Sequence, residues 1–389
     1  MIHKFKTKET DIGFDFDVEF EPNQKIHCII GKNGIGKTQL LENMAKSLVI
    51  KHSIFFKDGL FHHKNIYEKL KDIELKVPLE IEINNILIKD KKSEPWVYTK
   101  FEFINSIVNK NLTCDKPIIF IGAKNRGFTK NIDPDNIKIL ANSEGRFVES
   151  IKRTTKYING EGLENEEVAN WFVSRVIVNP NFVVAKQNKM NEVETVLRLI
   201  EKLEPSLELL IENKDGSVTL DMSYNEGELL INNIPLNRLS TGFVSIIKIF
   251  QEIVAGYGGW SNIDDLNSVD GIVFIDEIEP HLHISWQTKI LNILRDFFPN
   301  TTFYISTHSP LVLAGLKENE AYELYHEDKI VKTKKIKNID NYFLGDIVRK
   351  FFGVDLNMDK LEALENDSEE DKRAKSGQEF LNFIENMED

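Results

Sequence analysis

Thiols and long apolar runs are scarce in this sequence. Its two cysteines, Cys28 and Cys114, cannot build a disulfide framework or a four-thiolate zinc site. No run approaches the ~18 uncharged apolar residues of a membrane helix, and the residues after Met1 do not resemble a signal peptide. We therefore expect a protein without a membrane span, located in the reducing cytoplasm.

Basic residues are outnumbered, because 49 Lys and Arg face 62 Asp and Glu, for a formal net charge of −13. This balance argues against a general DNA coat, although a local basic strip stays open. Modest basic clusters occur at Lys89, Lys91, Lys92, Lys100, Lys110, Lys124, Arg126, Lys130, Arg146, Lys152, Arg153 and Lys156. Such clusters are typical of solvated faces, and nucleic-acid binding is the alternative.

The 389 residues are 41% hydrophobic, which suffices for one large or two coupled domains. Short apolar runs predict strands buried on both faces, at 26–30, 117–122, 272–275 and 302–305. A helix is predicted over Ser285–Phe298, and the stretch from Ser143 to about Asn213 is mostly helical. Strands and helices thus alternate at both ends of the chain, which predicts an α/β core interrupted by a helical lobe.

A glycine-rich segment follows the first buried run. Gly31–Thr38 matches the phosphate-loop pattern G-x-x-x-x-G-K-[ST], between an apolar strand and an amphipathic helix. Glycines let the backbone N–H groups surround a triphosphate, and the following helix presents its positive end. The residues expected to bind the nucleotide are Asn33, Gly34, Ile35, Gly36, Lys37 and Thr38. We expect Lys37 to contact the β- and γ-phosphates and the Thr38 hydroxyl to hold Mg²⁺.

Two acids end the run Ile272–Ile275, where open α/β sheets bind ligands. Asp276 is placed to hold Mg²⁺ together with Thr38, and Glu277 to orient or deprotonate the attacking water. His308 follows the next buried run, where its imidazole could reach a γ-phosphate or that water. Glu277 and His308 are therefore the predicted catalytic residues.

A further helix opens at Leu239–Phe243, with Ser240 as a good N-cap. In this order, the four features resemble an ABC-type ATPase: Walker A at Gly31–Thr38, the signature at Leu239–Phe243, Walker B at Ile272–Glu277 and the switch histidine His308. The resemblance implies a P-loop NTPase head with a mixed sheet and flanking helices. It also implies two heads bound head to tail around ATP, with Ser240 and Gly242 contacting the partner's nucleotide.

The residues after the Walker B strand differ from those of ABC transporter ATPases and point to a smaller group within the family. Ile278–His283 replaces the usual P-T-S-A-L-D, and His283 stands where the Asp that crosses the dimer would be. This run and Ser306–Pro310 are similar to soluble SMC-like, RecF-like and OLD-type ATPases, and Tyr342–Gly353 resembles Septu-type and retron-associated defence ATPases. After the strand at 117–122, the expected Gln is missing, and Ala123–Arg126 leaves open which residue senses the γ-phosphate.

We divide the chain into four parts: an N-terminal part of the head with a β-containing insert (1–140), a helical lobe (141–235), a C-terminal part of the head (236–335), and a helical segment with an acidic tail (336–389). The segment after His308 is too short for the nuclease domain of OLD-type proteins. A paired-histidine metal site at His281 and His283 has little support.

The resemblance implies a magnesium-dependent ATPase that forms a homodimer, with higher oligomers left open. It implies a sensor or switch in anti-phage defence that controls a separate effector, a nuclease or toxin. A DNA-repair ATPase of the RecF or SMC kind, a transporter subunit, and a nucleic-acid binding protein with structural ATP are the alternatives.

Overall fold

The structure is a computed structural model. It describes residues 1–8, 10, 12–53, 69–70, 73–78, 80–90, 97–100, 107–108, 114–131, 135, 137, 139–162, 167–176, 189–214, 218–225, 227–261 and 265–353. Two compact units divide the chain, Met1–Asp340 and Asn341–Asp389. Residues 354–389, which include the expected acidic tail, lie outside the described residues, as do Lys91, Lys92 and Lys110 of the basic clusters.

A mixed sheet forms the centre of the first unit. Its parallel part runs in the order β17 (Ala321–Glu327), β3 (Ile26–Ile30), β16 (Thr302–Ser306), β15 (Ile272–Ile275) and β9 (Ile118–Ile121). Every residue of β3, β9, β15 and β16 is buried, as continuous apolar runs predict. Because β16 lies between β3 and β15, the segments that follow these three strands emerge at one edge of the sheet.

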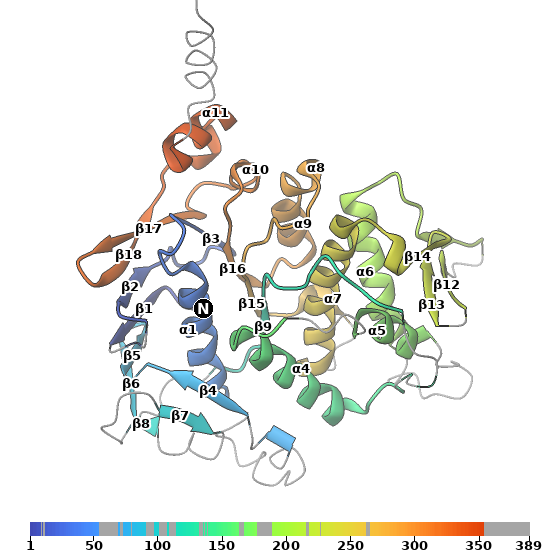
Figure 1. The fold of residues 1–389 in the computed structure, drawn as a ribbon, viewed down its shortest axis with the longest axis horizontal. Helices are drawn as coiled ribbons and strands as arrows, with labels where there is room; N and C mark the ends of the chain where they lie inside the picture. Colours follow the sequence, from blue (N-terminus) through green and yellow to red (C-terminus); the bar gives the residue numbers. More distant parts are fainter. Residues whose placement is uncertain are drawn as a thin grey trace, which may run out of the picture. The chain divides into compact units, whose positions relative to one another are not determined.

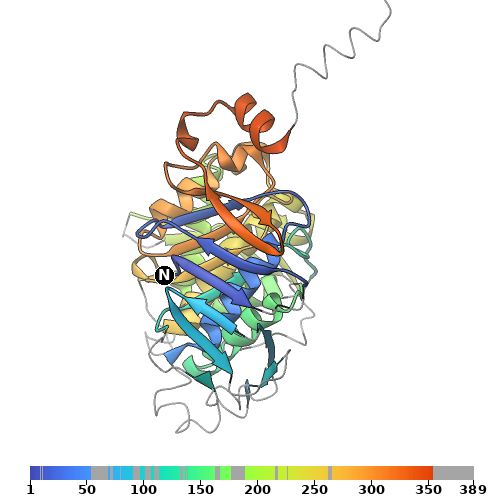
Figure 2. The same ribbon diagram turned by 90° about the vertical axis from the view of Figure 1, so that its left-hand side faces the viewer.

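The other end of the sheet is mostly antiparallel. β1 (Lys4–Lys8) pairs with β2 (Asp15–Glu19) and β5 (Glu80–Ile83), and β6 (Ile86–Asp90) continues to β8 (Ile107–Val108). β18 (Ile330–Lys335) forms a hairpin with β17 and joins β2 in parallel. Figure 2 looks onto this end, with blue β1 and β2 between the cyan and orange strands. β4 (Glu74–Val77) and β7 (Val97–Lys100) form a separate pair.

Helices pack on both faces of β9 (Figure 1). α1 (Lys37–Ile50) contacts β9, β15 and β16, and α4 (Ser143–Ile158) packs beside it. Ile118 and Phe120 join the core cluster with residues of α1 and α4. Ile119, on the alternate face, contacts α7 (Thr241–Ser261), where a Cβ at Gly256 would come within 3.0 Å of it. The fold class predicted from the sequence, α/β with a mixed sheet and flanking helices, is confirmed.

The segment between the two halves of the sheet contains α4, α5 (Glu167–Val176) and α6 (Met190–Leu203). The helical pattern ends at Leu203, before Pro205, as the missing proline N–H requires. Two small sheets that the sequence analysis did not predict follow. β10 (Leu210–Glu212) pairs with β11 (Val218–Leu220). β12 (Met222–Asn225), β13 (Glu228–Ile231) and β14 (Ile234–Pro235) form the second.

One predicted helix is divided. The prediction of a continuous helix over Ser285–Phe298 is wrong, because α8 (Ile284–Gln287) and α9 (Ile290–Phe297) are separate. The Thr288 hydroxyl donates to the Ser285 carbonyl at 2.9 Å, a local bond that competes with the helix. α10 (Pro310–Leu313) follows β16. In the second unit, α11 (Leu344–Ile347) continues into a π-helical turn, Val348–Phe352.

Candidate functional site

The glycine-rich loop joins β3 to α1. Gly34 and Gly36 have φ angles of 77° and 100°, in the region that favours glycine. A Cβ at Gly36 would lie 2.8 Å from ring atoms of Phe14, so this position is closed to side chains for steric reasons as well. Asn33 and Gly34 are exposed, whereas Ile35 and Gly36 are buried. The loop therefore presents its tip to solvent while its base is packed against β2.

Lys37 begins α1 and is 6% exposed. Its Nζ donates to the carbonyl oxygens of Gly31 at 2.9 Å and Lys32 at 3.2 Å. Burial lowers the pKa of Lys37, and the nearby carboxylates of Glu277 and Asp276 oppose that shift. The ammonium thus lies across the loop, held by weak neutral acceptors that an anionic phosphate could replace.

Thr38 and the end of β15 meet, although 238 positions separate them in sequence. The Thr38 hydroxyl donates to Asp276, with Oγ1 2.9 Å from Oδ2 and 3.1 Å from Oδ1. Ser306, at the end of β16, donates to Oδ1 of Asp276 at 2.7 Å. Neighbouring oxygen ligands of an octahedral Mg²⁺ lie ~3 Å apart. The Thr38 and Asp276 oxygens therefore fit the ion, with further positions left for water and phosphate.

Glu277 has an unusual backbone for a residue with a side chain. Its φ is 46°, in the left-handed region, which is uncommon outside glycine and often found at functional sites. Its N–H donates to the Ser306 hydroxyl at 2.7 Å, so Ser306 supports both acids of the pair. Asp276 is buried and Glu277 is partly exposed. The two carboxylates therefore occupy different environments, and Glu277 is the one that solvent reaches.

Glu279 is a residue that the sequence analysis did not assign. Its carboxylate accepts from the Thr307 hydroxyl at 2.7 Å and from the His308 N–H at 2.6 Å. The segment after β15 is thus connected to the segment after β16 by charged hydrogen bonds. The backbone of His308 is held by Glu279, while its side chain is partly exposed.

A short loop follows β9, at the point where the resemblance leads us to expect a Gln. Arg126 in this loop has no exposed surface, and its Nη2 donates to the Asp276 carbonyl at 3.2 Å and to the Glu277 carbonyl. Sequence reasoning grouped Arg126 with solvated basic residues, and that interpretation is wrong for this side chain. Arg146 is likewise buried, and Arg153 pairs with Glu252 at 3.2 Å.

The signature segment begins α7. Ser240 is exposed and caps the helix, accepting from the Phe243 N–H at 3.2 Å. Among the described residues, Ser240 therefore bonds within its own helix and not to the cluster around Lys37. Gly242 is buried, and a Cβ there would come well inside 3.0 Å of the His281 carbonyl oxygen. Ser245, one turn on, donates to the Pro280 carbonyl at 3.1 Å. Gly242 thus has a packing role within its own chain.

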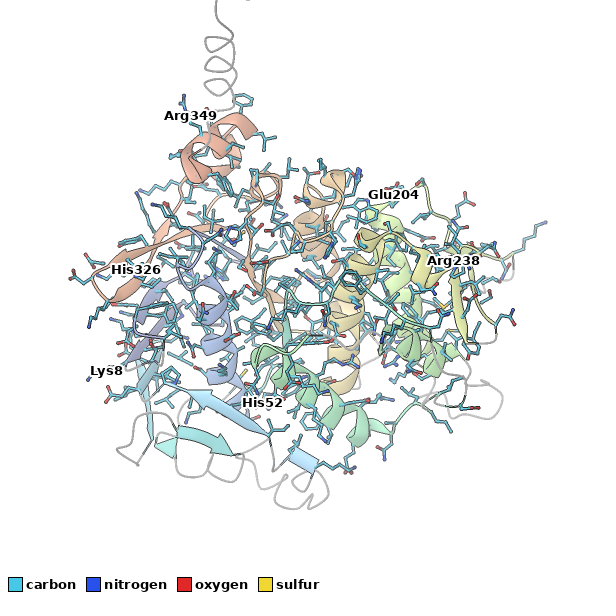
Figure 3. All side chains as sticks on the ribbon, in the orientation of Figure 1. Lys8, His52, Glu204, Arg238, His326 and Arg349 are labelled. Atoms are coloured by element: carbon cyan, nitrogen blue, oxygen red, sulfur yellow. The ribbon has the colours of Figure 1, made fainter. Side chains whose placement is uncertain are left out.

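His283, which follows the acid pair, bonds to its own segment of the chain. His283 accepts from the Ser285 N–H at 3.3 Å and caps α8. Trp286, in α8, donates its indole N–H to Glu204 at 3.1 Å. Glu204 lies at the end of α6 and is labelled in Figure 3. Within the described ranges, no group of three His, Cys, Asp or Glu side chains could hold a metal ion.

Several known proteins are similar to this chain in sequence. The family described as "AAA domain, putative AbiEii toxin, Type IV TA system" matches residues 130–314. Septu protein PtuA of Bacillus mycoides strain KBAB4 is 26% identical over 91% of this chain and 44% of its own length. Septu protein PtuA of Bacillus thuringiensis is 23% identical over 86% of this chain and 80% of its own length.

A retron protein is a further relative. The "Retron Vc95 probable ATPase" of Vibrio cholerae serotype O1 biovar El Tor is 30% identical over 40% of this chain and 30% of its own length. Among solved structures, the Smc head domain of Pyrococcus furiosus, bound to the C-terminal domain of ScpA, covers 86% of this chain and 96% of its own. Its identity is 13% and its TM-score 0.41. The predicted resemblance to Septu-type and retron-associated ATPases is confirmed by these relatives.

Two further findings concern how far these comparisons extend and whether the chain has a membrane helix. The chain spans less than half of the first Septu relative and less than a third of the retron ATPase. None of the helices in the described part of the chain is long and apolar enough to cross a membrane.

Proposed function

We propose that this protein binds and hydrolyses ATP with Mg²⁺ between two heads arranged head to tail, and that it acts as a switch for a separate effector in anti-phage defence. One observation carries the chemical part. Lys37, Thr38, Asp276 and Glu277 come from segments far apart in sequence and meet at one edge of the parallel strands. This is where sheets of this kind bind phosphate ligands.

Each residue has a task in the proposed reaction. Lys37 exchanges its carbonyl acceptors for the β- and γ-phosphate oxygens, and Thr38 and Asp276 hold the metal. When bound, Mg²⁺ offsets the charge that develops on the phosphates. Glu277, partly exposed and held by its backbone, orients the attacking water or accepts its proton, and His308 reaches the γ-phosphate.

The dimer supplies the remaining contacts. Ser240 and Thr241 are exposed at the start of α7, so a second copy can bring this helix end to the nucleotide of the first. A helix N-terminus favours phosphate oxygens, because its N–H groups and dipole point toward the ligand. Hydrolysis then depends on association of two heads.

The effector is expected to be a separate polypeptide, a nuclease or toxin. The proposal rests on the Septu and retron relatives. Affinity purification of the tagged protein from its native host, followed by mass spectrometry, identifies the partner. Recovery of a transport permease instead would contradict the defence role.

Two variants test the ATPase site. Lys37→Ala should lower the rate of phosphate release by ~100-fold, because a charge next to the reacting phosphate is lost. Lys317→Ala removes an exposed lysine and is the matched control. Wild-type rates in Lys37→Ala would place the activity elsewhere, and a wild-type protein that binds no ATP would defeat the proposal.

The dimer has its own test. Glu277→Gln keeps the shape of the side chain but removes the base, so it should accumulate an ATP-bound dimer. Light scattering after gel filtration with Mg-ATP measures the mass, and the exposed Glu318→Gln is the control. An unchanged monomer mass for Glu277→Gln, under conditions where it binds ATP, would refute the sandwich arrangement.

A further inference from the structure

The loop after β9 carries a buried cation directly beneath the acid pair. Arg126 has no exposed surface, and its Nη2 donates to the backbone carbonyls of Asp276 and Glu277. Within the described part of the chain, its Nε and Nη1 have no hydrogen-bond partner. Burying a guanidinium with two unpaired donor atoms costs free energy, so a residue chosen only for packing would be apolar.

The surroundings of Arg126 keep it charged. The guanidinium of Arg126 lies near the carboxylates of Glu279, Asp276 and Glu277, and arginine stays protonated in proteins. The side chain is therefore a cation near neutral pH. Because its hydrogen bonds go to the main chain of residues 276 and 277, it constrains the turn itself, including the left-handed Glu277.

A second buried cation holds the loop that carries Arg126. Lys248 lies on α7, the helix that Ser240 opens, and has no exposed surface. Its Nζ donates to the Asn125 carbonyl at 2.6 Å and to the Phe128 carbonyl. These two carbonyls stand on either side of Arg126 in the chain. The helix that begins with the signature is thus bonded to the loop, and the loop is bonded to the turn that carries Glu277.

We propose that Lys248 and Arg126 form a relay that ties the position of α7 to the geometry of Glu277. Both are positioning residues, since neither is exposed to a nucleotide. In a dimer, Ser240 engages the partner's nucleotide, whereas Glu277 serves the nucleotide of its own head, so the relay lets one site report to the other. This inference rests on the proposed function and adds the coupling path, in which Arg126 takes the place of the missing Gln.

Steady-state kinetics test the relay. Arg126→Gln and Lys248→Met should each lower kcat by ~10-fold or more, because a misplaced catalytic group costs rate steeply. The KM for ATP should change by less than ~3-fold, since the phosphate loop keeps its contacts. The double variant should lose little more than either single one, because both break the same path. Arg126→Lys should restore part of kcat, and thermal melting checks that each variant is folded.

The control lies in the same loop. Lys130 is exposed, so Lys130→Met removes a neighbouring cation outside the path. It should leave kcat within ~2-fold of the wild type. Folded Arg126→Gln and Lys248→Met variants with wild-type kcat would overturn the relay, even when the wild type hydrolyses ATP as proposed.

A second measurement needs no nucleotide. The N–H groups of Asp276, Glu277 and Ile278 donate to the Ile121 carbonyl and to two oxygens of Ser306. Hydrogen exchange of a peptide covering residues 276–279 should become faster in Arg126→Gln and, by a similar factor, in Lys248→Met, while Lys130→Met leaves it unchanged. An unchanged exchange rate in Lys248→Met would refute the proposed link between Lys248 and the loop that carries Arg126. If the wild type hydrolyses no ATP, this result still decides the relay separately from the proposed function.

Discussion

Gly242→Ala distinguishes a packing role of Gly242 within its own chain from the proposed contact with the partner's nucleotide. In the structure, a Cβ at this position would come well inside 3.0 Å of the His281 carbonyl oxygen, whereas normal contacts are ~3.5 Å. Either the start of α7 or the segment around His281 must shift by several tenths of an ångström. Overpacking of this kind costs ~1–3 kcal/mol. Replacing a helical glycine by alanine otherwise stabilises a helix by up to ~1 kcal/mol.

Overpacking lowers the free energy of unfolding, whereas the higher helix propensity of alanine raises it, so the sign of the measured change decides between them. We expect Gly242→Ala to lower the free energy of unfolding by ~1–2 kcal/mol in the absence of nucleotide. Urea denaturation measures it, with Thr241→Ala at the adjacent exposed position as control. A variant that is more stable than the wild type, and that loses only ATP-dependent association, would refute the packing role and leave Gly242 to the partner's nucleotide.

Two further predictions concern stability. Glu279→Ala should lower the free energy of unfolding by on the order of 3 kcal/mol, because two charged hydrogen bonds to Thr307 and His308 are lost. Glu279→Gln should lose less, and equal losses in urea denaturation would contradict this. His27 is buried, stacks on Tyr304 at a centroid distance of 4.8 Å, and burial lowers its pKa to about 3. Because the unfolded chain binds this proton from pH ~6.5 downward, stability is lost between pH ~6.5 and 3. His27→Phe should remove on the order of 3 kcal/mol of the loss between pH 7 and 4, and an unchanged slope would count against it.

The buried strands, the glycine-rich loop between β3 and α1, and the acid pair that follows β15 were readable from the sequence. A fully buried strand needs a continuous apolar run, and β3, β15 and β16 have one. A tight loop with positive φ angles before a helix needs glycines at fixed spacing, and Gly31–Thr38 has them. These are local requirements, so neighbouring residues carry the whole signal, and the α/β fold class followed from them. The division of α8 from α9 was missed, because it depends on the Thr288 side chain bonding locally.

Long-range contacts decided the rest. Nothing near Arg126 in sequence shows that it is buried under the main chain of residues 276 and 277, because that contact requires β9 to pair with β15. Glu279 likewise acquires its partners only when β16 lies beside β15, and Gly242 meets His281 only when α7 packs on that segment. The spacing of apolar residues along a short segment does not show which distant side chain will pack against it. The sequence determined which groups are available for the proposed phosphate chemistry, and the tertiary structure decided which buried residues hold them in place.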